Sequence, residues 1–307
     1  MPRLLQSARV ALACAAIATG AAVGCASVLG IEADRTYVPP DEGGSPEAGG
    51  DDAQDAGPVE TAPVQPPGWA CLNDPVPATP SGNVDLHLNL TDVSGATTSG
   101  ATGPPIVGAE VHACAKLDLT CVGAFDSVTT DDAGLAALSI PGGFDGYYEV
   151  HAQSFTNAVL SRPPLLAPET QQQGMARISL LQSAGALAGV TQDPSLSIAI
   201  VTIEDCSAAV AAGIVFTVGN AQPNETVVYL ENNLPSQSAT QTDKVSGSAL
   251  VFNVPPGTLT LSAAFADTKA TIRTVTTIGR DNNWVTYAQI RPDQASVHFD
   301  GGAGPGG

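Results

Sequence analysis

Short runs in which apolar and polar residues alternate, separated by turn residues, fill most of the sequence beyond position 83. The clearest run is Val84 to Val93, where Val84, Leu86, Leu88 and Leu90 occupy alternate positions. Successive side chains of a strand point to opposite faces, so these four share one buried face. Runs of this kind, with turn residues about every ten positions, are typical of a β-sandwich. The sequence therefore predicts an all-β fold.

Further strands are predicted by the same pattern along the rest of the chain. They lie at 108–115, 122–130, 135–140, 147–151, 176–181, 198–204, 213–218, 226–230, 249–254, 258–264, 270–276 and 284–290. Helix signals are scarce, and one short helix is predicted at 183–190.

The region contains an internal repeat. Asp92 and Asp205 each follow a predicted strand and lie 113 positions apart, and the T-D turns of Asp131 and Asp243 lie 112 apart. A period of roughly 110 residues is the size of one β-sandwich domain. We therefore expect two similar domains, at 70–165 and 193–293, joined by a connector at 166–192 that holds the helix.

The order of motifs resembles a known family. A strand is followed by an Asp-x-Ser turn, a G-A-x-V strand at Gly108–Val111, a T-D-x-x-G turn at Thr130–Gly134 and a strand that ends in Pro and Gly. This order is similar to the carboxypeptidase regulatory-like, or transthyretin-like, domain over Val84–Ala152 and more weakly over Ile198–Ala264. The resemblance implies two Greek-key (transthyretin-like or immunoglobulin-like) sandwiches. In that family the domain is an accessory, adhesive or binding module, generally without activity.

The first 24 residues have the layout of a signal peptide. Arg3 and Arg9 precede an uncharged run, Val10 to Val23, that is shorter than the about 20 apolar residues a membrane-spanning helix needs. The small residues before Cys25 resemble the lipobox of bacterial lipoproteins, in which the cysteine is acylated. This resemblance implies a lipid anchor at Cys25, and Ala26 after it favours the outer membrane, with the protein periplasmic or surface-exposed. The alternative is ordinary cleavage nearby and a secreted protein with a spare thiol.

Cysteine parity favours the anchor. Of six cysteines, Cys14 leaves with the leader, and acylation of Cys25 would leave four, an even number suited to disulfides. Cys114 and Cys121 flank a hairpin-sized connection and are expected to pair, which leaves Cys71 and Cys206 for each other. Other pairings stay open, because four cysteines allow three connectivities.

The residues that follow Cys25 lack the apolar content of a folded domain. Pro, Gly, Ala, Asp and Glu dominate up to Trp69, and 25–69 is therefore predicted to be an anchor and a disordered linker, with a flexible Gly-rich tail at 294–307. Removal of the leader leaves 9 basic and 30 acidic side chains. Nucleic acid is excluded as a partner, since phosphates are bound by Lys and Arg. The expected partners are a lipid bilayer, through acylated Cys25, and an envelope protein or a glycan.

Few residues suggest chemistry. No nucleotide-binding, metalloprotease or serine-hydrolase motif occurs, and the four histidines are scattered. A metal site at His112 and Cys114 and a calcium loop at Asp131 and Asp132 are weaker readings than a disulfide and a turn. We expect no catalytic residue, metal or cofactor, and a non-catalytic structural, adhesion or binding scaffold. A hydrolase with an unrecognised site is the more distant alternative.

Three aromatic residues are candidates for a sugar-binding platform. Trp284 and Tyr287 lie three positions apart, hence on opposite faces of a strand, so one is expected in the core and the other exposed. Tyr148 is the third candidate. Exposed rings on a β-sandwich stack on sugars, which makes a carbohydrate-binding module the main alternative function, whereas core packing is the plainer role for all three.

Overall fold

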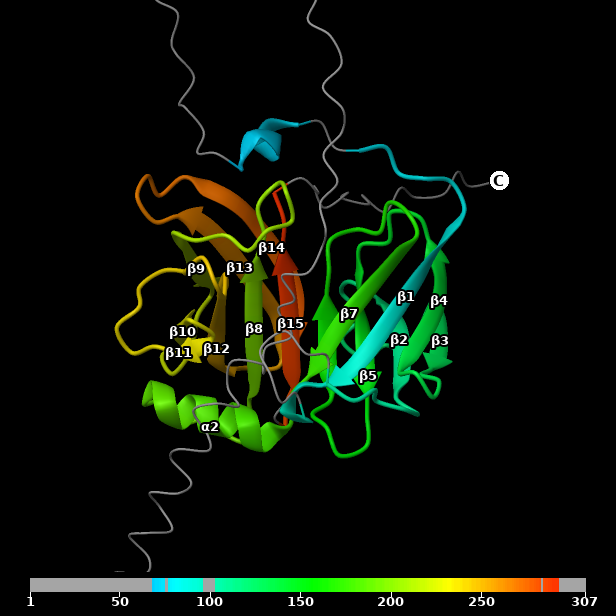
Figure 1. Cartoon of the computed structure of the whole chain (residues 1–307), viewed down its shortest axis with the longest axis horizontal. Helices are drawn as coiled ribbons and strands as arrows, with labels where there is room; N and C mark the ends of the chain where they lie inside the picture. The colour runs from blue at the N-terminus through cyan, green and yellow to red at the C-terminus, as the bar shows by residue number, and fades with distance from the viewer. Residues whose placement is uncertain (1–67, 75–76, 96–102, 283, 293–307) are drawn as a thin grey trace, which may run out of the picture.

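The computed structural model describes residues 68–74, 77–95, 103–282 and 284–292. The predicted leader, Cys25, the linker up to residue 67 and the tail lie outside them. Within the described residues the chain is built from strands, with one α-helix and two short 3₁₀ helices (Figure 1). No helix in this part of the chain combines the length and the apolar character needed to span a bilayer.

The first half of the described chain consists of strands and two 3₁₀ turns. Its elements are η2 (Ala70–Asn73), β1 (Asn83–Asp92), η3 (Val93–Gly95), β2 (Glu110–Ala115), β3 (Asp126–Thr129), β4 (Leu135–Pro141), β5 (Gly146–His151), β6 (Ala158–Ser161) and β7 (Glu169–Met175). The second half begins with the helix, α2 (Ile178–Ala188), and continues with β8 (Ser197–Ile203), β9 (Ile214–Gly219), β10 (Thr226–Glu231), β11 (Leu234–Pro235), β12 (Ser248–Val254), β13 (Gly257–Phe265), β14 (Thr271–Gly279) and β15 (Val285–Ile290).

The strands form one large sheet and two small ones. The large sheet has the order β11-β10-β12-β8-β15-β6-β5-β2-β3, and the small sheets have the orders β4-β1-β7 and β14-β13-β9. The last strand, β15, runs parallel to β8 on one side and parallel to β6 on the other, so that Val285 lies opposite both Ile198 and Ala158. Strands from both predicted domains therefore share a single continuous sheet.

The two halves have the same topology. In the first, β1 pairs with β4 and, in parallel, with β7; in the second, β8 pairs with β12 and, in parallel, with β15. Likewise β5 lies between β2 and β6, and β13 lies between β9 and β14. The large sheet thus joins one sheet of each sandwich, edge to edge. This junction also removes two exposed strand edges, which are sites of unwanted pairing.

The repeated T-D turns are built alike in atomic detail. The buried hydroxyl of Thr130 accepts from the N–H of Ala109 and donates to the carbonyl of Ile106. The hydroxyl of Thr242 does the same with Ile214 and Ala211. These turn threonines fix equivalent corners of the two sandwiches, which accounts for the sequence repeat.

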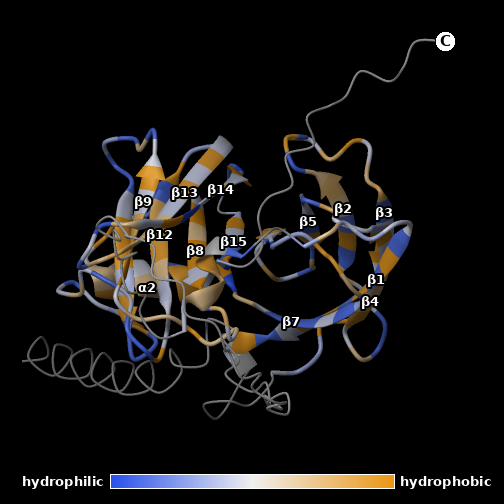
Figure 2. Cartoon of the chain, turned by 90° about the horizontal axis from the view of Figure 1, so that it is seen from above, coloured by the Kyte–Doolittle hydropathy of each residue, from blue (hydrophilic) through white to orange (hydrophobic). Residues whose placement is uncertain are grey.

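The hydrophobic cores lie on opposite faces of the large sheet. Ile198 and Ile200 of β8 belong to a core that includes the interior of the first sandwich and the buried face of α2, whereas Ala199 and Val201 face the sheet β14-β13-β9. Because both of its faces are covered, β8 is almost entirely apolar. β1 has one face exposed and alternates, as the bands of Figure 2 show on several strands.

The connector differs from the expected one. The strand predicted at 176–181 is displaced to β7, which ends at Met175, and the helix begins five residues earlier than predicted, at Ile178. The helix ends at Gly189, whose positive φ of 72° lets its N–H reach the carbonyl of Ala186 while the N–H of Val190 reaches that of Gly185. This Schellman pattern explains the end of the helix.

The beginning of the described chain is fastened to the second half. A disulfide joins Cys71 to Cys206 across a sequence separation of 135 residues, and Trp69 is buried in the core of the second sandwich, edge to face with Phe265. The chain then continues from η2 to β1 in the first half. The first and second halves are therefore linked both by this bond and by the shared sheet.

Candidate functional site

Two of the three proposed platform residues are in the core. Tyr148 is 3 % exposed and Tyr287 is 6 % exposed, and both belong to the core of the first sandwich. The hydroxyl of Tyr287 accepts a hydrogen bond from the N–H of Ala176, and burial raises the pKa of this tyrosine to about 12. Tyr148 packs against Phe144. Both rings therefore have the plainer role of core packing, and the alternative of a sugar-binding platform is wrong for these two, because their strand positions face inward.

Trp284 lies on the opposite face from Tyr287, as its position three residues earlier predicts. It is half-buried beside β6 and β14. The ring of His151 meets it edge to face at 5.2 Å, and the guanidinium of Arg280 lies 5.4 Å from its centre. Part of the indole is therefore covered by His151 and Arg280. Only the exposed part of the Trp284 ring remains a candidate surface for stacking on a sugar.

A buried carboxylate lies next to Trp284 on this face. Glu149 of β5 is 6 % exposed, and Nη2 of Arg280 donates to both of its oxygens at 3.1 Å. The same Nη2 donates to the hydroxyl of Tyr147 at 3.1 Å, and Nε2 of His151 lies 3.6 Å from Glu149 Oε1. Tyr147, Glu149 and His151 are alternate residues of β5 and so share its outer face. We call Tyr147, Glu149, Arg280 and the disulfide described next the Glu149 cluster.

The electrostatics of the Glu149 cluster favour a neutral tyrosine beside an ion pair. Burial raises the pKa of Tyr147 to about 12; Arg280 lowers it and Glu149 raises it to smaller extents. A buried charge is tolerated when an opposite charge and hydrogen bonds compensate it, and Arg280 does both for Glu149. No sequence pattern indicates this pair, because Glu149 and Arg280 are 131 residues apart and meet only where β14 lies against the large sheet.

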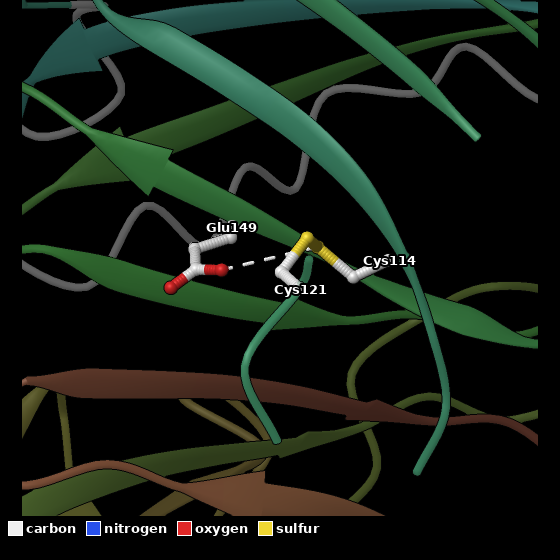
Figure 3. Close-up of side chains that lie close together, drawn as sticks. All are labelled: Cys114, Cys121 and Glu149. Carbon is white, nitrogen blue, oxygen red and sulfur yellow. Dashed lines mark hydrogen bonds between the residues drawn. A yellow bond between two sulfur atoms is a disulfide. The ribbon is translucent and has the colours of Figure 1, made fainter. Parts of the chain in front are cut away.

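A disulfide covers the carboxylate. Cys114, which is fully buried, is bonded to Cys121, as expected from their spacing. Figure 3 shows Glu149 directed at this bond, with Cys114 Sγ 3.9 Å from Glu149 Oε2. A disulfide sulfur carries no proton, so this approach is a contact and would become a hydrogen bond only in the thiol. The ligand atoms of Cys114, Cys121 and Glu149 all lie within 4.8 Å of one another.

The same disulfide restrains an exposed apolar loop. We call Lys116–Phe125 the apolar loop, because it exposes Leu117 (68 %), Leu119 (43 %), Val122 (87 %) and Phe125 (54 %). These are four of the seven large apolar side chains that the described residues expose, so such side chains are concentrated in this loop. Such clusters mark interaction sites in soluble proteins.

Polar groups of the apolar loop are bonded within the loop and to β5 and the turn before it. The carboxylate of Asp118 accepts from the N–H and the hydroxyl of Thr120, and these hydrogen bonds lower the pKa of Asp118. The hydroxyl of Tyr147 donates to the carbonyl of Asp118, and Lys116 Nζ pairs with Asp145 at 2.7 Å. The loop is therefore restrained by its own hydrogen bonds and by contacts to neighbouring residues, with four apolar side chains exposed.

The weaker chemical candidates can be placed as well. Asp131 uses its carboxylate to accept from the N–H groups of Ala133 and Leu135, the turn role expected of it. His112 Nδ1 is 2.8 Å from the hydroxyl of Ser127, with Glu110 Oε2 3.8 Å from Nε2. The acid is 65 % exposed and beyond hydrogen-bond distance, so this carboxylate does not orient the imidazole as a triad requires. We assign no catalysis to it.

Comparisons with known proteins give only distant similarities. No protein-family model and no curated protein sequence matches the chain. The similar solved structures include the Bacillus anthracis TIE protein (TM-score 0.22, 13% identity, 68% of this chain and 34% of that one). The shaft pilin spaA from Lactobacillus rhamnosus GG is another (TM-score 0.23, 12% identity, 69% and 99%). A streptococcal ancillary pilin is a third (TM-score 0.19, 14% identity, 70% and 64%). The chain thus spans about a third of the TIE protein, and TM-scores this low support no functional conclusion.

Proposed function

We propose that this chain is a non-catalytic adhesion and structural module of a bacterial cell envelope, and that the apolar loop is the surface with which it binds a protein partner. The observation that carries the proposal is the concentration of exposed Leu, Val and Phe side chains on one loop, whose residue Cys121 is tied to Cys114 of β2 by a disulfide. The surrounding double sandwich serves as a rigid support for this loop.

The restraint of the loop favours specific binding. Ordering a free loop at an interface costs side-chain and backbone entropy, and that cost is smaller when the loop is already fixed. Here a disulfide ties Cys121, inside the loop, to the end of β2, and hydrogen bonds join Asp118 to Thr120. The aromatic ring of Phe125 is supported by Phe144, edge to face at 5.5 Å. The apolar loop therefore presents its side chains in a preformed arrangement.

An apolar protein surface suits the loop better than a sugar or an anionic membrane. Sugar sites use flat ring faces, whereas this loop exposes mostly branched aliphatic side chains. Anionic lipid head groups attract Lys and Arg, and the only basic residue in the loop, Lys116, is paired with Asp145. A carbohydrate module remains the second candidate through Trp284. Loss of glycan-array binding in Trp284→Ala, with binding retained in Leu117→Ser/Val122→Ser, would favour it.

The anchoring part of the proposal rests on the sequence. The cysteine at position 25 would be acylated, placing the module at the outer membrane. Several acyl chains give a durable anchor, since each buried methylene contributes about 0.8 kcal/mol. Labelling of cells with a palmitate analogue tests this directly: wild type should incorporate label and Cys25→Ser should not. Recovery of unlabelled wild-type protein from the culture medium would contradict it.

Photocrosslinking on intact cells tests the adhesive surface. A benzophenone amino acid replaces Val122 in the apolar loop, and the matched control carries it at Val245, which is 43 % exposed in the second half. The proposal predicts a discrete protein adduct from position 122 that is absent from position 245 and is reduced by Leu117→Ser. Adducts only with lipid or glycan, equal adducts at both positions, or no adduct would overturn it.

A further inference from the structure

The Glu149 cluster contains three metal-ligand groups that the disulfide keeps from acting together. Cys114 lies on β2 and Glu149 on the neighbouring strand β5, with Cys121 brought over them by the apolar loop. Their sulfur and carboxylate atoms lie within 4.8 Å of one another. Neighbouring ligand atoms of one tetrahedral zinc ion, bonded at about 2.0–2.3 Å, lie about 3.5–3.8 Å apart. A zinc ion would therefore need the carboxylate to approach by no more than about 1.3 Å, and the two sulfur atoms to move apart, which breaking their bond allows.

We propose that reduction of the Cys114–Cys121 disulfide converts the Glu149 cluster into a zinc-binding site. The step requires a thiol or phosphine reductant, which supplies two electrons; with two protons the disulfide becomes two thiols, and the reductant is oxidised. Zinc then displaces both thiol protons, and two zinc–thiolate bonds form. The oxidised protein has no thiolate at this place and does not bind zinc there, so the site is controlled by the redox state.

The surroundings of the three ligands suit a bound zinc ion. Two thiolates and a carboxylate carry three negative charges, and with Zn²⁺ one negative charge remains, which Arg280 beside Glu149 compensates. Metal-bound carboxylates usually accept a hydrogen bond from such an outer group, which orients them. Burial of Cys114 and Glu149 limits solvent at the site. Three protein ligands leave the fourth tetrahedral position for water.

This site is independent of the adhesive role of the apolar loop, although the two share the disulfide. Reduction alone would free Cys121 of the apolar loop from Cys114 of β2, whereas a bound zinc ion would link these two residues again. The observable consequence is a metal affinity that appears only after reduction.

Cobalt titration of the full chain tests the site, because cobalt(II) bound to thiolates gives a charge-transfer absorption band. The protein is compared before and after phosphine reduction, with circular dichroism to verify that the reduced protein stays folded. Reduced wild type should bind Co²⁺ with this band and release it to Zn²⁺, and the oxidised protein should not. The variant Cys114→Ser/Cys121→Ser retains all other cysteines and should lose the difference.

Two matched substitutions test whether the Glu149 carboxylate is a metal ligand. Glu149→Gln keeps both thiols and the shape of the side chain, and it should weaken cobalt binding by about tenfold or more, as expected for loss of a ligand or its support. Glu110→Gln removes an exposed carboxylate from the same strand face and should have no effect. An absent band in folded, reduced wild type, or an equal band in the Cys114→Ser/Cys121→Ser variant, would overturn the proposal, as would equal cobalt affinity of Glu149→Gln and Glu110→Gln.

Discussion

Removing the Cys71–Cys206 disulfide measures how strongly the beginning of the folded chain is fastened to the second sandwich. The bond joins residues 135 positions apart, and so it constrains a long loop of the unfolded chain. In the chain-entropy treatment, closing a loop of this length stabilises the folded state by about 5 kcal/mol. The Cys114–Cys121 bond spans only seven positions and contributes about 2.5 kcal/mol on the same scale. Cys71→Ser/Cys206→Ser should therefore lose about twice as much unfolding free energy as Cys114→Ser/Cys121→Ser.

Guanidinium unfolding followed by circular dichroism, without reductant, gives both free energies. The comparison between the two serine pairs cancels the chemical change, since each replaces one disulfide by two hydroxyl groups. A local consequence is also expected in the Cys71→Ser/Cys206→Ser variant. Trp69 lies two residues before Cys71 and is buried in the core of the second sandwich. The fluorescence of Trp69 should therefore change at a lower denaturant concentration than the circular dichroism of this variant. Equal losses for the two pairs, or a larger loss for the short loop, would refute this account of the long bond.

Three further predictions concern buried polar groups. Thr130→Val and Thr242→Val each remove a hydroxyl that both accepts and donates a hydrogen bond in a buried turn. Each substitution should lower the unfolding free energy by about 1–3 kcal/mol. A lower unfolding free energy in only one of the two variants would contradict the equivalence of the two turns. Tyr147 and Tyr287 have pKa values raised by burial from 10.0 to about 12, so the stability they contribute is complete below pH 10 and is lost as pH rises toward 12. The tyrosinate absorbance of wild type minus that of Tyr147→Phe, or of Tyr287→Phe, should show one group that ionises in native protein only near pH 12. Ionisation of either group near pH 10 would contradict its burial. Burial would raise the pKa of Asp243, but hydrogen bonds from nearby backbone N–H groups outweigh it and lower the pKa below 3.8. The free energy of unfolding should therefore fall as pH drops through this range, and it should fall less in Asp243→Asn. Parallel profiles of unfolding free energy against pH in wild type and variant would contradict this.

The local features of the fold could be predicted because they depend on neighbouring residues. Alternation in Val84–Leu90 places β1, and the T-D turns of the two halves mark equivalent corners. The structure also joins the cysteine pairs that parity and spacing favour. Each of these signals lies within a short stretch or compares two similar stretches.

The junction between the sandwiches could not be predicted, because it depends on contacts between distant strands. The parallel pairing of β15 with β6 brings together residues 127 positions apart, such as Val285 and Ala158, and neither short strand carries a pattern that specifies its partner. The sequence does hold one indirect sign. The unbroken apolar run of β8 indicates a strand covered on both faces, whereas β1 alternates.

The candidate site likewise has one part that the sequence predicts and one part that it does not. Spacing along the chain predicts the Cys114–Cys121 bond. It does not predict that Glu149 and Arg280 lie next to this bond, because Arg280 follows the end of the distant strand β14. From the sequence, Tyr148 and Tyr287 are possible platforms, with core packing as the plainer role, because aromatic residues serve in cores and at surfaces alike. The direction in which each strand position faces decides between the two roles, and both rings are buried. The apolar loop is only partly predictable, because Val122 and Phe125 fall within the strand predicted at 122–130, whereas β3 begins at Asp126.

Hydrogen exchange in Leu88→Ala tests most directly whether the two sandwiches form one body through the shared sheet. Leu88 is fully buried in the first core, and its truncation should cost about 2–5 kcal/mol. If both halves unfold together, the slowest amides of β13, in the second half, should exchange faster by the same factor as those of β1. Unchanged exchange in β13, with faster exchange confined to the first half, would show that the sandwiches are independent and contradict this account.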